Sequence, residues 1–242
     1  MKTNLVATVA AIVGGIVVSL SGVRAAQEPP SPDQLVASLK QNLAASAKRL
    51  RQYEWVETTS ISLKGEEKSR KQQRVYYGAD GKLTKLPIGS APAAAPPAPT
   101  GRRGGRVMNR VVENKKDDMA DYMERAAALI HQYVPPNPEL IQKAKDAGKM
   151  AVKPDQGKVR VEFRDFVQPA DVMTIDVDAK ALLLAAVNVA TYLEEKEDAV
   201  TLDVRFGTLT DGTGFPARTT LAAKAKNITV VIENSGHRPM GK

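Results

Sequence analysis

The stretch from Val200 to Phe206, VTLDVRF in one-letter code, has the most regular alternation of apolar and polar residues in the chain. Successive side chains of a β-strand point to opposite faces of a sheet, so one face of this strand is apolar and the other is polar. An antiparallel sheet with one side against a core and the other in water produces this pattern. The stretch therefore predicts a strand of such a sheet.

The sequence on both sides of this strand contains further segments of the same kind. They are alternating, or rich in β-branched and aromatic residues, and short turns join most of them. Because a parallel crossover needs about a dozen residues, we expect neighbouring strands to pair antiparallel, in a sheet of about eight to ten strands. The further segments are residues 53–63, 68–77, 83–86, 159–164, 173–177, 182–192, 215–222 and 228–232.

The segment 182–192 differs from the others because it is apolar on both faces, so both faces need a cover. Three helices are predicted, and the second and third of them are available for this role. One begins at Pro32 and runs to about residue 51, one covers residues 119–134, and one follows Asn137, which is a suitable capping residue. The prediction is an α+β fold: a large curved antiparallel sheet, or incomplete β-barrel, with an N-terminal helix and an inserted helical pair as a lid.

The N-terminus has the three parts of a secretory signal peptide. Lys2 supplies the positive charge, residues 5–20 form an apolar run, and small residues follow. Val23 and Ala25 fit the narrow peptidase cleft, so we expect residues 1–25 to be removed by cleavage after Ala25, with cleavage after Ala26 as the alternative. The other interpretation is an uncleaved membrane anchor, since the apolar run is nearly long enough to span a bilayer.

Composition supports an exported, periplasmic protein that is soluble after cleavage. The chain has no cysteine, which excludes a lipid anchor on a thiol, disulfides and thiol chemistry. The formal charge is +8 for the whole chain and about +6 once residues 1–25, with Lys2 and Arg24, are removed, and this charge suits a compartment that faces anionic lipid. Aromatic residues make up only 5% of the chain, so the core must consist mainly of aliphatic residues and methionine.

Residues 26–242 are expected to form a single domain with one irregular segment. Residues 88–106 are rich in Ala, Pro, Gly and Arg, which is typical of a disordered loop, and residues 107–149 form the helical insert. The loop carries Arg102, Arg103 and Arg106, which could attract the protein weakly to an anionic membrane surface. An exported protein has little access to nucleic acid, so no nucleic-acid partner is expected.

No group of residues has the spacing of a catalytic or metal site. The chain has two histidines, His131 and His237, and neither stands among the carboxylates that a zinc site without cysteine would need. The acidic pairs at 66–67, 117–118 and 194–195 fall where turns or helix ends are expected. We expect no catalytic residue, no metal and no cofactor. A hydrolase with an unrecognised pair of carboxylates stays open as an alternative.

The order of the predicted elements resembles the LolA-like family of exported lipoprotein carriers and related lipid-binding proteins. The resemblance rests on Tyr53-Glu54-Trp55, on Val75-Tyr76-Tyr77-Gly78 before the Asp80-Gly81 turn, and on Leu202 to Phe206 leading to Leu209-Thr210-Asp211-Gly212-Thr213. It implies a half-open barrel with a helical lid, and a lipid or an acylated protein as partner. It implies no catalytic residue.

An apolar cavity is therefore the candidate site. Methionines gather in the helical insert, and unbranched thioether chains adapt to apolar ligands of variable shape. Large side chains on the strands would complete the lining. The predicted ligand-binding residues are Trp55, Tyr77, Met119, Met123 and Phe163. The alternative is an envelope scaffold or adaptor protein whose core is solid and binds no ligand.

Overall fold

The computed structural model describes residues 32–89, 119, 121–134 and 137–241. In these residues the strands are β1 (Tyr53–Leu63), β2 (Glu66–Tyr77), β3 (Leu83–Pro87), β4 (Met150–Asp155), β5 (Lys158–Arg164), β6 (Val172–Asp178), β7 (Leu184–Tyr192), β8 (Ala199–Thr208), β9 (Gly214–Ala223) and β10 (Ile228–Pro239). The helices are α1 (Pro32–Leu50), a helical segment at 121–130, α3 (Pro138–Asp146) and the short 3-10 helix η1 (Lys224–Lys226).

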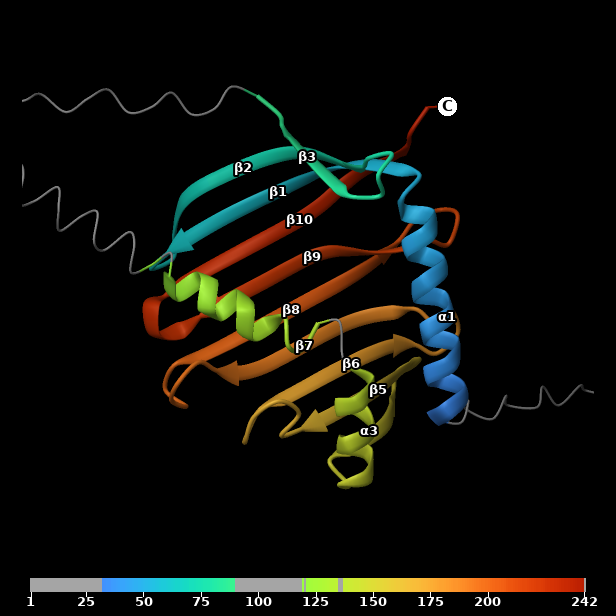
Figure 1. Cartoon of the computed structure of the whole chain (residues 1–242), viewed down its shortest axis with the longest axis vertical. Helices are drawn as coiled ribbons and strands as arrows, with labels where there is room; N and C mark the ends of the chain where they lie inside the picture. The colour runs from blue at the N-terminus through green and yellow to red at the C-terminus, as the bar shows by residue number, and fades with distance from the viewer. Residues whose placement is uncertain (1–31, 90–118, 120, 135–136, 242) are drawn as a thin grey trace, which may run out of the picture.

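All ten strands belong to one sheet in the order β3-β2-β1-β10-β9-β8-β7-β6-β5-β4. Every neighbouring pair is antiparallel, and the last strand returns to pair with the first, so that Tyr53 lies opposite Pro239. The sheet is open, with β3 at one edge and β4 at the other (Figure 1). The predicted fold class, a large open antiparallel sheet with helices, is confirmed.

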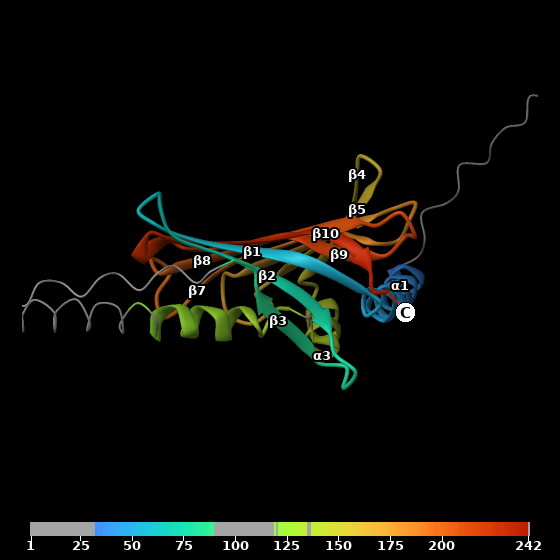
Figure 2. The same cartoon turned by 90° about the horizontal axis from the view of Figure 1, so that it is seen from above.

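Two described helices lie on one side of this sheet. The chain leaves the sheet at one edge strand, β3, and re-enters it at the opposite edge strand, β4. The 121–130 helix and α3 lie on that face, and the β2–β3 side of the sheet bends toward them (Figure 2). We call this concave, helix-bearing face the inner face.

Helix α1 stands at one end of the strands, across their direction (Figure 1). Several hydrogen bonds join it to the turns there. Among them, Asn42 Nδ2 donates to the carbonyl of Leu182 at 2.9 Å, Arg49 Nε donates to Thr213 Oγ1 at 2.9 Å, and Ser46 Oγ accepts from the amide of Gly214 at 3.1 Å. Side-chain bonds to backbone of this kind satisfy turn groups that the ladder leaves unpaired. They fix the helix against the sheet.

A buried aliphatic and aromatic core fills the space between the inner face and the helices. Its residues from the helical side include Ala126, Ile130 and Tyr133, and those from β5 to β8 include Phe163 and Met173. Asn137 caps α3 as predicted, because its side chain accepts a hydrogen bond from the amide of Glu139 at 2.8 Å. In the described residues no helix is long and apolar enough to cross a membrane.

Three details of the sheet differ from the sequence-based expectation. The segment predicted at 182–192 begins as a strand only at Leu184, and a register shift places Leu184, Val187 and Val189 on the inner face. The helices do not cover its other face (Figure 2). There Ala186, only 1% exposed, lies in register between the longer side chains of Asp176 and Arg205.

The other two differences concern strand β4, which was not predicted, and β10, which continues seven residues beyond the predicted end at 232.

Some of the predicted features lie outside the described residues. They are the signal peptide at 1–25, residues 90–106 of the predicted loop with Arg102, Arg103 and Arg106, and residues 107–118 of the insert.

Candidate ligand-binding face

The inner face is apolar from the covered half of the sheet to its open half. One row of register partners crosses seven strands, and every member is apolar: Ile61, Val230, Leu221, Leu202, Val189, Met173 and Phe163. Exposure rises along this row toward β1. Met173 is fully buried, Leu221 and Val230 are half-buried, and Ile61 is 40% exposed. The apolar surface thus extends past the part that the described helices cover.

We call the half-buried part of this surface the open floor and define it by Ile61, Leu221, Val230 and Ile232. Thr59 and Thr219 lie opposite Ile232 on its two neighbouring strands, and their methyl groups extend this apolar surface. Water in contact with such a surface is unfavourable, and large exposed apolar patches in proteins mark places that bind something. Among the residues that the structure describes, the open floor is therefore a candidate surface for an apolar ligand.

The 121–130 helix borders one end of the open floor. Tyr122, Ala223 and Ile228 form a second buried cluster, and partly buried apolar side chains pack against it. These side chains are Leu63, Met119, Met123, Leu193 and Val230. Val230 therefore joins the open floor to the methionines at the start of the helical region.

An aromatic cluster borders the other end. The ring centroids of Trp55 and His237 are 5.6 Å apart in a stacked arrangement, those of Phe215 and His237 are 4.0 Å apart, and those of Trp55 and Tyr77 are 6.1 Å apart. Trp55 Nε1 donates to Asn234 Oδ1 at 3.0 Å. Buried indole N–H groups need such a partner, so the bond fixes the ring in place.

Burial in this cluster lowers the pKa of His237 from its ordinary value of 6.5. The neutral ring is therefore the form that suits the fold. The stability that depends on a neutral His237 is fully present above pH 6.5, the pKa of the unfolded chain. It is lost as the pH falls through the pKa of His237 in the folded protein, which lies below 6.5. The sequence pattern gave no reason to expect a buried histidine here, but the structure places His237 inside β10 between two aromatic rings.

We expect the imidazole of His237 to titrate with a midpoint below 6.5 in the folded protein. The proton NMR signals of the two histidines measure this directly, and His131→Ala identifies which signal belongs to His237. Phe215→Ala opens the cluster to water and should move the midpoint back toward 6.5. A wild-type midpoint at or above 6.5 would contradict the burial of this ring.

Glu57 and Lys85 form an ion pair on the same face, beside the aromatic cluster. Lys85 Nζ lies 2.7 and 2.8 Å from the two carboxylate oxygens of Glu57, and Glu57 is only 8% exposed. The pair ties the edge strand β3 to β1 across β2. It also gives the aromatic end of the inner face a polar boundary, so the most apolar surface is the floor between the two ends.

The structure does not bring the five predicted ligand-binding residues into one place. Trp55 and Tyr77 pack together in the aromatic cluster, while Met119 and Met123 belong to the second cluster at the opposite end of the floor. Phe163 is 2% exposed and packs against Phe166 in the main core, with ring centroids 5.2 Å apart. The first four residues border the open floor, and Phe163 lies away from it.

Sequence reasoning did not select the residues of the open floor itself. Val230 and Ile232 stand at alternating positions of a predicted strand, so their common face could be inferred. The pairing of β10 with β1, which brings Ile61 beside Val230, depends on the strand order of the whole sheet. The sequence gives no local signal for that pairing.

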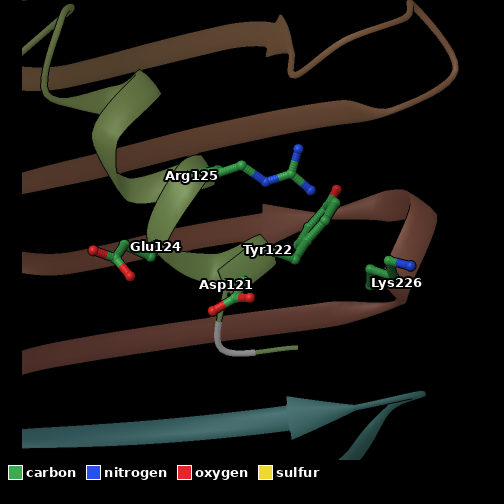
Figure 3. A pocket seen from close by; sticks show the side chains of 5 residues that line it. All are labelled: Asp121, Tyr122, Glu124, Arg125 and Lys226. Carbon is green, nitrogen blue, oxygen red and sulfur yellow. The ribbon is translucent and has the colours of Figure 1, made fainter. Parts of the chain in front are cut away.

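A pocket of about 610 Å³ opens where the 121–130 helix meets η1. Asp121, Tyr122, Glu124, Arg125 and Lys226 line it (Figure 3). Tyr122 is 3% exposed, and its hydroxyl donates to Asp198. Burial and this bond raise the pKa of Tyr122, so the phenol stays neutral. Two cations approach its ring, with Lys226 Nζ 5.6 Å and Arg125 Cζ 5.8 Å from the ring centroid.

No histidine or carboxylate grouping in the described residues has the composition of a metal site. The acidic pairs Glu66-Glu67 and Glu194-Glu195 lie on exposed surface, where Glu66 binds Lys68 and Glu194 binds Arg125. Such exposed pairs contribute little and need no functional explanation.

No model of a known protein family matches the chain, and no curated protein sequence matches it significantly. Comparison with solved structures finds a DUF1329 family protein from Desulfovibrio piger, 13% identical with a TM-score of 0.37 over 84% of this chain and 93% of that one. It also finds a LolA superfamily protein from Nitrosomonas europaea, 10% identical with a TM-score of 0.36 over 84% of this chain and 94% of that one. At these TM-scores the likeness is distant, and the description of the fold rests on the strand order itself.

Proposed function

We propose that this chain is an exported binding protein that shields an apolar ligand, a lipid or the acyl chain of a lipoprotein, on the open floor of its inner face. The observation that carries the proposal is the apolar row from Phe163 to Ile61, which continues beyond the helices and reaches 40% exposure at Ile61. An acyl chain laid on the open floor at the end of this row would bury its methylenes, and each buried methylene contributes about 0.8 kcal/mol.

The bonds of the 121–130 helix support a position for the ligand beside this helix. Near its start Tyr122 donates to Asp198, and just after its end Tyr133 donates to the buried Asp171 at 2.5 Å. The second bond lies in the core, where a broken hydrogen bond is costly. A ligand that required the helix to lift away would have to break it. We therefore place the ligand beside the helix, with Met119 and Met123 as adaptable walls, rather than beneath it.

Delivery to the periplasm follows from the N-terminal signal sequence, residues 1–25, and is part of the proposal. In that compartment a lipid needs a protein surface to cross water, and a cationic chain is attracted to anionic membranes within about a Debye length. Arg102, Arg103 and Arg106 are the residues proposed for this contact. An acylated protein would present the same chain chemistry as a free lipid.

We expect the protein, purified gently from its native compartment, to carry bound lipid at one ligand per chain. Native mass spectrometry measures this, and uptake of a fluorescent fatty acid by delipidated protein measures the affinity. Unfolded protein in urea is the control for non-specific uptake. A clean ligand-free mass together with no uptake of the fatty acid would refute the binding function and favour the scaffold alternative.

A further inference from the structure

We propose that the pocket around Tyr122 binds the headgroup of a zwitterionic phospholipid, with its phosphate at Lys226 and Arg125 and its ammonium at Asp121. This inference rests on the proposed function, because the acyl chain of the same lipid would lie on the open floor. The ligand is then a phospholipid whose headgroup carries both a negative and a positive charge, as phosphoethanolamine does.

The position of Tyr122 connects the headgroup pocket to the floor. Its ring is buried against Ile228 and Ala223, and Val230 packs on the same cluster. Lys226 precedes Ile228 by only two residues, so the turn that carries the cation leads directly into the strand that carries the floor. A ligand with a polar end at Lys226 and an apolar end at Val230 and Ile61 therefore meets matching chemistry along its length.

The pocket has both signs of charge within its lining, and two of these charges are available. In the part of the chain that the structure describes, neither Lys226 nor Asp121 forms an ion pair, and both are exposed. Arg125 pairs with Glu194, but both side chains are more than half exposed, so this pair is weak and can exchange for a phosphate. Guanidinium groups bind phosphate oxygens in a two-bond geometry that favours such an exchange.

The directions of the side chains support this division of roles. Figure 3 shows Arg125 and Lys226 beside the ring of Tyr122 and Asp121 near the start of the helix, while Glu124 points away from the ring. A headgroup in this pocket would therefore have two cations on one side and one carboxylate on another. A purely anionic headgroup would leave Asp121 facing a negative charge, and that contact is unfavourable.

The test uses three ligands with one oleoyl chain each, so that only the headgroup differs. They are lysophosphatidylethanolamine, lysophosphatidylglycerol and the uncharged oleoyl glycerol, measured by displacement of the fluorescent fatty acid. We expect the zwitterionic lipid to bind up to about fivefold more tightly than either of the others, the range for solvent-accessible charge contacts. Free phosphoethanolamine should not displace the probe at the same concentration.

Charge reversals assign the roles of the individual residues. Lys226→Glu should weaken both phospholipids about fivefold and leave oleoyl glycerol unchanged, while Asp121→Lys should reverse the preference toward the anionic lipid. Lys224→Glu, an exposed residue of the same 3-10 helix that does not line the pocket, is the matched control and should change nothing.

The possible outcomes separate the two proposals. If none of the three oleoyl ligands binds, the proposed function is wrong and the headgroup proposal is wrong with it. If all three bind equally and the charge reversals change nothing, the headgroup proposal is wrong while acyl-chain binding stands. Displacement by free phosphoethanolamine as strong as that by the lipid would show a site for a soluble phosphate ester and would also overturn the phospholipid assignment.

Discussion

Asp171→Ala is expected to lower the free energy of unfolding by about 4 kcal/mol, near the upper end of what one substitution does. Asp171 is fully buried in the loop between β5 and β6. Its carboxylate accepts hydrogen bonds from three successive backbone amides, those of Phe166, Val167 and Gln168, at 2.5, 2.9 and 2.8 Å. Alanine would leave these donors buried without a partner.

The same carboxylate also fixes the helical insert. The hydroxyl of Tyr133 donates to Asp171 at 2.5 Å and lies 2.8 Å from Thr191 Oγ1 on β7, so one buried network joins the insert, the loop and the sheet. Fully satisfied buried networks of this kind stabilise a structure, and removing one member affects all the others. Tyr133→Phe, which removes only the hydroxyl, should therefore cost less, about 1–2 kcal/mol.

Urea unfolding followed by circular dichroism measures both changes. The matched control is Asp203→Ala, which removes a carboxylate paired with Arg205 on the exposed outer face and should change stability by less than about 1 kcal/mol. If Asp171→Ala does not fold, Asp171→Asn retains one acceptor oxygen and should be intermediate. An Asp171→Ala protein within 1 kcal/mol of the wild type would show that the loop finds other partners, contrary to this prediction.

Much of the sheet could be predicted because its strands have strong local patterns. The segment 53–63 was predicted with the bounds that β1 has, and the alternation at Val200 to Phe206 falls within β8. These segments combine period-two alternation with β-branched residues, which is the most reliable strand signal. Short turns then required antiparallel neighbours, and the described strands obey this rule.

Strand β4 and the second half of β10 were not predicted because their residues have no alternating apolar pattern. They are strands because of the neighbours with which they pair in the sheet. Pro154 interrupts the pattern of β4, and proline is tolerated there because β4 is an edge strand with one unpaired side. The residues of β10 after Ile232 are mostly polar, yet they pair with the part of β1 between Thr58 and Tyr53. Such pairing is visible only when the whole strand order is known.

The candidate site was predictable in kind but not in position. Trp55, Tyr77, Met119 and Met123 were selected as large or adaptable side chains, and the structure places them at the two ends of the open floor. The floor itself is made by partners from β1, β9 and β10, which are far apart in sequence. Tyr122 was missed because it looks like an ordinary core residue of the predicted 119–134 helix. The two cations over its ring, Arg125 and Lys226, come from different elements.

Ile61→Asp is expected to weaken binding of every acyl ligand by at least about 30-fold, which corresponds to about 2 kcal/mol. Ile61 is the most exposed member of the open floor, so a bound chain would have to cover the new carboxylate and strip it of water. Burying an unpaired charge against hydrocarbon is strongly unfavourable. The folded protein alone loses little, since the residue is already 40% exposed.

The matched control for this prediction is Leu86→Asp. Leu86 is 38% exposed and also lies in a strand. It pairs with Arg74, and the next pair in the register, Val75 and Lys85, lies on the inner face, so Leu86 belongs to the outer face. Both variants introduce the same charge at equal exposure and should unfold at similar urea concentrations. Fatty-acid uptake should be lost in Ile61→Asp alone. Equal uptake by the two variants, or equal loss in both, would show that the ligand does not lie on the inner face at β1.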